Sequence, residues 1–161
     1  MSDRSGPVLI GYDGTQSAEH ALREAAALLA DRRALVVVVI KPGLAFELIE
    51  PPASSIGLPP APIDIRTALE VERTMSEAAR DGAQRAAALA RELGLDAEPL
   101  VVAEEPEITV SETLLRVASE RDARAIVLGA HEHGPIVGGT MRGVLRDATR
   151  PVVVARAHGT A

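Results

Sequence analysis

The sequence contains no cysteine, a single lysine and almost no aromatic residues. The lysine is Lys41, and the aromatic residues are Tyr12 and Phe46. Without cysteine the chain has no disulfides and no thiolate chemistry, which fits a reducing compartment, so we expect a cytoplasmic protein. With so few aromatic rings, the core must be built from aliphatic side chains, and the bases of a nucleic acid would find few stacking partners.

Long hydrophobic runs and an excess of positive charge are also missing. The formal net charge of −6 repels a phosphate backbone, so we expect no nucleic-acid partner. The longest apolar runs are far too short to cross a bilayer, and no basic and apolar leader precedes the first predicted strand, so we expect no membrane insertion. The length of 161 residues fits one domain of ordinary size, and we predict a single domain over residues 1–161.

Short apolar runs alternate with helical patterns along the chain. We predict five strands, at residues 7–11, 35–40, 97–102, 125–128 and 152–154. We predict four helices, at residues 15–29, 65–93, 111–120 and 139–148, the second of them bent at Gly82. Prolines crowd an irregular insertion at about residues 43–63. This alternation predicts a doubly wound three-layer α/β sandwich, with helices on both faces of a parallel sheet.

Two turns are the candidates for a binding site, because ligands of such sheets bind beyond the carboxyl ends of the strands. Asp13 follows the first predicted strand, where it can orient a base or ribose, or hold a metal ion through phosphates. The alternative role for Asp13 is the N-cap of the following helix. Gly138, Gly139 and Thr140 begin the last predicted helix, whose free N–H groups suit an anion, although any tight turn also uses glycine.

Other chemical motifs are incomplete. Potential metal ligands occur at His131, Glu132 and His133. In an extended segment the two histidines would point to one side and Glu132 to the other, so we expect exposed loop residues and no metal site. Arg142 and Arg146 could reach an anion from the last helix, or they are solvated. The sequence lacks a nucleophile elbow and a Walker A lysine, so we expect no catalytic residues and no enzyme activity beyond slow, incidental ATP hydrolysis.

Three stretches stand out together with the proline-rich insertion: VLIGYDGT at residues 8–15, AIVLG at 125–129 and VLRDATRPVVV at 144–154. In this combination, nearly the whole chain resembles the universal stress proteins. It implies a five-stranded parallel sheet of order 3-2-1-4-5, with adenosine held at the positions of Asp13 and Val39. It also implies phosphate binding on a glycine-rich loop between the fourth strand and the last helix. The implied nucleotide-binding residues are Asp13, Gly14, Thr15, Val39, Gly129, Gly134, Gly138, Gly139 and Thr140.

This loop departs from the family pattern Gly-x2-Gly-x9-Gly-[Ser/Thr]. Glu132 replaces the second glycine, where Gly134 can take over the tight turn, and the Gly139-Thr140 pair arrives three residues early. Two hypotheses therefore stand. In the first, the chain is a stress-response regulator or survival factor that binds an adenine nucleotide, ATP with Mg²⁺. In the second, it is a nucleotide-free interaction protein. The resemblance implies a homodimer through the last strand, residues 152–154, in both.

Overall fold

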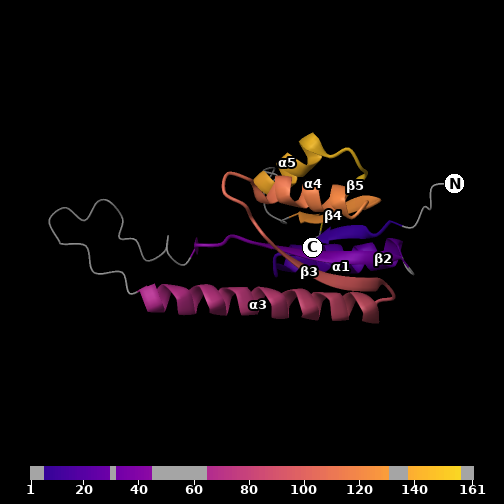
Figure 1. The fold of residues 1–161 in the computed structure, drawn as a ribbon. Coiled ribbons are helices and arrows are strands. Elements are labelled where there is room, and N and C mark those ends of the chain that lie inside the picture. The colour runs from indigo at the N-terminus through magenta and orange to yellow at the C-terminus, as the bar shows by residue number, and fades with distance from the viewer. Residues whose placement is uncertain (1–5, 30–31, 45–64, 131–137, 157–161) are drawn as a thin grey trace, which may run out of the picture.

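The computed structural model describes residues 6–29, 32–44, 65–130 and 138–156. Five parallel strands form one sheet (Figure 1). In chain order they are β1 (Val8–Gly11), β2 (Arg33–Ile40), β3 (Asp96–Ala103), β4 (Ala125–Ala130) and β5 (Val152–Arg156). Their spatial order is β3-β2-β1-β4-β5, so the predicted fold class and strand order are confirmed.

Four helices within the described ranges cover the two faces of the sheet (Figure 1). They are α1 (Gln16–Leu28), α3 (Ile65–Glu92), α4 (Val110–Glu120) and α5 (Gly139–Asp147). Helices α1 and α3 pack with the sheet in one core cluster, and α4 and α5 pack with it in the other. The arrangement is the three-layer sandwich that the alternating pattern predicts. None of the helices in these ranges is long and apolar enough to cross a membrane.

The central strands are buried because both of their faces lie under helices. Leu9 and Ile10 of β1 are fully buried on opposite faces, one in each core cluster. The continuous apolar run of β2 follows the same logic, with Val36 in one cluster and Val37 in the other. Since neither face of such a strand meets water, the sequence shows no alternation of polar and apolar residues.

Helix α3 packs through alanine. Ala83, Ala87 and Ala90 on one face are fully buried, and their small side chains let the helix lie close to the sheet. The predicted bend at Gly82 is wrong, because α3 continues as a single helix through that residue and runs straight in Figure 1. Gly94 follows the helix with a φ of +99°, a left-handed conformation typical of glycine at a helix C-terminus. Most of the predicted insertion falls on residues 45–64, outside the described ranges.

Candidate functional site

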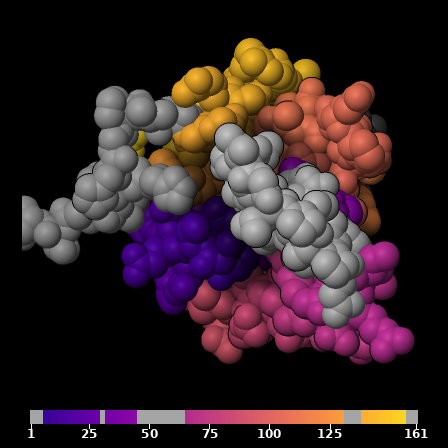
Figure 2. Space-filling model, turned by 90° about the vertical axis from the view of Figure 1, so that its left-hand side faces the viewer, coloured from indigo at the N-terminus to yellow at the C-terminus, as the bar shows by residue number. Residues whose placement is uncertain are grey.

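A cavity of about 360 Å³ opens at the carboxyl ends of the strands. Its walls come from the turn after β1, the ends of β2, β4 and β5, and the starts of α4 and α5. Figure 2 is a view onto this end of the molecule, with the indigo N-terminal elements, α4 in orange and α5 in yellow. Segments that are far apart in sequence thus meet where the doubly wound topology places ligands.

Seven of the nine residues predicted to bind nucleotide line this cavity: Asp13, Thr15, Val39, Gly129, Gly138, Gly139 and Thr140. Gly14 is not among the lining residues. It has a φ of +80°, so glycine at this position serves the shape of the turn. Gly134 lies outside the described residues.

The turn after β1 is held by a local network of hydrogen bonds. Thr15 is the N-cap of α1, and its Oγ1 accepts a hydrogen bond from the backbone N–H of Ala18 at 3.2 Å. Asp13 Oδ1 accepts from the Thr15 backbone N–H at 3.0 Å and from the Thr15 hydroxyl at 2.6 Å. The alternative in which Asp13 itself caps the helix is therefore wrong. Asp13 orients the capping threonine, and its carboxylate is exposed at the cavity.

The start of α5 presents bare backbone to the cavity. Gly138 is the N-cap and makes no side-chain capping bond. The first intrahelical bond runs from Arg142 N–H to the Gly138 carbonyl at 2.9 Å, so the N–H groups of Gly139, Thr140 and Met141 have no partner within the helix. A Cβ added at Gly138 or Gly139 would meet none of the described atoms within 4 Å, and neither residue has a positive φ. Neither packing nor backbone conformation in the described structure therefore explains these two glycines, whereas close approach of an anion would.

Gly129 has a different role. A Cβ at this position would overlap the backbone carbonyl of Ser17, at the start of α1. Gly129 therefore lets α1 cross β4 at very short range, so packing already requires a glycine here. The family pattern treats Gly129, Gly138 and Gly139 alike. In the structure, packing against α1 explains Gly129 and does not explain the other two.

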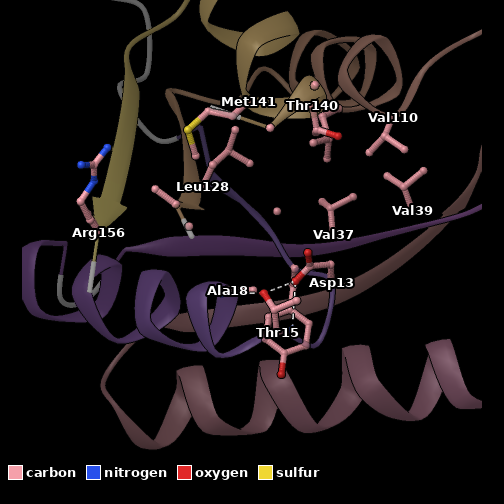
Figure 3. Close-up of a pocket in the computed structure, with 17 residues that line it drawn as sticks. Asp13, Thr15, Ala18, Val37, Val39, Val110, Leu128, Thr140, Met141 and Arg156 are labelled. Atoms are coloured by element: carbon pink, nitrogen blue, oxygen red, sulfur yellow. Dashed lines mark hydrogen bonds between the residues drawn. The ribbon is translucent and has the colours of Figure 1, made fainter. Parts of the chain in front are cut away.

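The remaining walls are mostly apolar, as Figure 3 shows. Val37 and Val39 project from β2 toward Val110 at the start of α4. Leu128 of β4 and Met141 of α5 line another part of the wall. Such a slot suits a flat, weakly polar ring. Of these five residues, only Val39 was predicted. The others fall on strands and helices whose apolar side chains look like core residues in the sequence.

Tyr12 also lines the cavity and stays uncharged near neutral pH. Burial raises the pKa of its phenol above the ordinary value, and the negative charge of Glu19 adds to the effect. The aromatic ring packs against the core cluster beneath α1 and α3. Tyr12 therefore adds no negative charge at this site near neutral pH.

The charged residues around the cavity differ from those considered in the sequence. Arg142 and Arg146 are not among the lining residues, and Arg146 forms an ion pair with Asp147 at 2.7 Å. Arg156, at the end of β5, does line the cavity. No sequence pattern marked it, because the predicted strand ended two residues earlier. Glu104, Glu105 and Glu107, which follow β3, do not line the cavity either, and Glu105 pairs with Arg116 of α4.

Within the described ranges, no cluster of three or more His, Asp or Glu side chains could hold a metal ion. The sequence candidates His131, Glu132 and His133 lie outside those ranges. A metal ion carried in by phosphates would need fewer protein ligands, because Mg²⁺ commonly keeps its waters and binds phosphate oxygens together with one or two carboxylates.

Comparison with known proteins identifies the family. The model of the universal stress protein family matches residues 5–156. The chain belongs to this family. A search of curated proteins found no match.

Solved structures of family members resemble the chain over nearly its full length. A universal stress protein family member from Burkholderia pseudomallei is 28% identical, with a TM-score of 0.59 and coverage of 95% of this chain and 97% of that one. A universal stress protein in complex with cAMP is 19% identical, with a TM-score of 0.59 and coverage of 96% and 98%. An Arabidopsis thaliana family protein with AMP bound is 11% identical, with a TM-score of 0.58 and coverage of 96% and 93%. At such low identity the last two show a common fold only.

Proposed function

We propose that this universal stress protein binds an adenine nucleotide in the cavity and acts as a stress-response regulator or survival factor, not as an enzyme. One observation carries the proposal. The start of α5 presents the Gly139 and Thr140 amides, which make no intrahelical hydrogen bond, to a cavity that also contains Asp13, and neither packing nor backbone conformation in the described structure requires glycine at positions 138 and 139. Two structural neighbours, crystallised with cAMP and with AMP, support the same class of ligand.

Two parts of the cavity would bind different parts of the nucleotide. Val39 and the apolar wall around it would hold the adenine, and the exposed carboxylate of Asp13 would accept hydrogen bonds from ribose hydroxyls. The amides of Gly139 and Thr140 at the positive end of the α5 dipole would hold phosphate oxygens. ATP with Mg²⁺ is the candidate ligand, in which the cation would offset phosphate charge near Asp13.

Calorimetric titration of the purified protein with ATP, ADP, AMP and cyclic AMP, each with Mg²⁺, tests this function. We expect saturable binding of at least one of them and its loss in Asp13→Ala. Because Asp13 also holds Thr15, Asp13→Asn is the matched variant, since the amide oxygen can still accept the Thr15 hydrogen bonds. Binding that weakens in Asp13→Asn while thermal stability is retained would assign the loss to the ligand contact. If none of the four nucleotides gives a measurable heat of binding, the result would favour the hypothesis of a nucleotide-free interaction protein.

We also propose that the chain forms a homodimer through β5. This strand lies at one end of the strand order and pairs with β4 alone in the described sheet. Val154 of this edge strand is 38% exposed, and an apolar edge of this kind favours pairing with another strand.

Light scattering after size exclusion tests the dimer. We expect the mass of two chains for the wild type and of one chain for Val154→Lys, because a charge on the edge strand opposes pairing. Leu69→Lys is the control, since Leu69 is 55% exposed on α3, which packs against β2 and β3 at the other side of the sheet. A monomeric wild type would contradict the proposal.

A further inference from the structure

Arg156 is the only lysine or arginine among the described residues that line the cavity. It belongs to β5, where its backbone is in register with Ala130 at the end of β4. No carboxylate in the described part of the chain forms an ion pair with it. The exposed guanidinium of Arg156 has no ion-pair partner among the described residues, so it is available to a ligand in the cavity.

The sheet order fixes where Arg156 lies relative to the apolar wall. Along the carboxyl edge, Val39 belongs to β2 and Arg156 to β5, three strand positions away. At the usual spacing of neighbouring strands, the two backbones are roughly 14 Å apart. Figure 3 shows Val39 and Arg156 at opposite sides of the cavity, with Leu128 and Met141 between them. A ring held against Val39 therefore lies far from the guanidinium.

We infer that Arg156 contacts the phosphates of the bound nucleotide and makes the cavity selective for phosphorylated nucleosides over free nucleosides. The inference rests on the proposed function. A nucleoside seated against Val39 occupies the β2 side of the cavity, and its phosphate chain would extend from the ribose across β4 toward β5. The α5 amides neutralise part of the phosphate charge as dipoles, and Arg156 supplies the full positive charge that the described lining otherwise lacks.

Arg156→Gln tests this role, because it keeps a polar side chain of similar length and removes the charge. The control is Arg150→Gln, which removes the same charge just before β5, at the opposite end of the strand, where Arg150 lies 3.4 Å from Asp122. Calorimetry with adenosine, AMP, ADP and ATP gives the dissociation constant of each ligand for the wild type and both variants. Thermal unfolding checks that each variant folds.

We expect Arg156→Gln to weaken binding of the phosphorylated ligands by about tenfold or more, the usual effect of losing a hydrogen bond between charged groups. Adenosine binding should stay unchanged, and Arg150→Gln should resemble the wild type. Equal losses for adenosine and ADP, no loss for either, or the same loss in Arg150→Gln would overturn the role of Arg156 while leaving the proposed function intact. A wild type that binds none of the four ligands would overturn both.

Discussion

The glycine at the start of α5 allows a substitution whose effects on stability and on binding have opposite signs. In Gly139→Glu the new Cβ meets no described atom within 4 Å, so we expect no steric penalty from the described structure. Glutamate has a higher helix propensity than glycine, and its charge lies at the positive end of the helix dipole. Together these effects stabilise the fold by roughly 0.5–1 kcal/mol. For a chain of 161 residues this raises the melting temperature by roughly 1–4 °C.

The same side chain places a carboxylate where the proposed ligand has phosphates. Two unit charges about 4 Å apart repel by roughly 1–4 kcal/mol between bulk water and a protein surface, which weakens affinity by about fivefold to several hundredfold. The assays are calorimetric titration with ATP and Mg²⁺ and thermal unfolding of the same samples. The matched control is Gly82→Glu within α3, which adds the same charge at a position that is also sterically open in the described structure and is not part of the cavity lining. A Gly139→Glu variant that binds ATP as tightly as Gly82→Glu does would refute the reasoning.

Three further predictions concern the fold. Gly129→Ala should lower the free energy of unfolding by roughly 3 kcal/mol or more in urea titrations, because its Cβ would overlap the Ser17 carbonyl; a wild-type midpoint would contradict the packing role. Thr113→Val should leave the free energy of unfolding unchanged or raise it by about 1 kcal/mol, since the fully buried Thr113 hydroxyl has no hydrogen-bond partner in the described structure. A clear decrease in this free energy would show that the hydroxyl does have a partner. Hydrogen bonds from the backbone and hydroxyl of Thr109 lower the pKa of Glu112, so its contribution to stability should be present above its ordinary pKa and disappear as pH falls through the lowered one. Melting temperatures of Glu112→Gln should therefore depend less on acid pH than those of the wild type, and equal slopes would argue against this effect.

The sequence predicts the fold well because its signals are local and repeated. The unbroken apolar run of β2 and the alanine face of α3 each identify an element without knowledge of its neighbours. Element ends were less accurate, since β5 reaches Arg156 and was predicted to stop at residue 154. That two-residue difference hid Arg156 from the list of candidate site residues.

The site itself is only partly visible in the sequence. Asp13, Gly138 and Gly139 were identifiable because turn residues after predicted strands are candidates for ligand contact. The division of roles between Asp13 and Thr15 was not predictable, because it depends on where α1 begins to within a residue or two. The packing role of Gly129 depends on how closely α1 crosses β4, a tertiary distance that no local pattern encodes.

The most direct test of the account is a titration of isotope-labelled protein with ATP and Mg²⁺, followed by backbone amide chemical shifts. The account predicts saturable shifts at Val39, Gly139 and Thr140, which line one cavity from two different elements, and little change at Asp122, at the opposite end of the sheet. Amide signals that do not move at any of these three residues, or shifts confined to another surface, would contradict it.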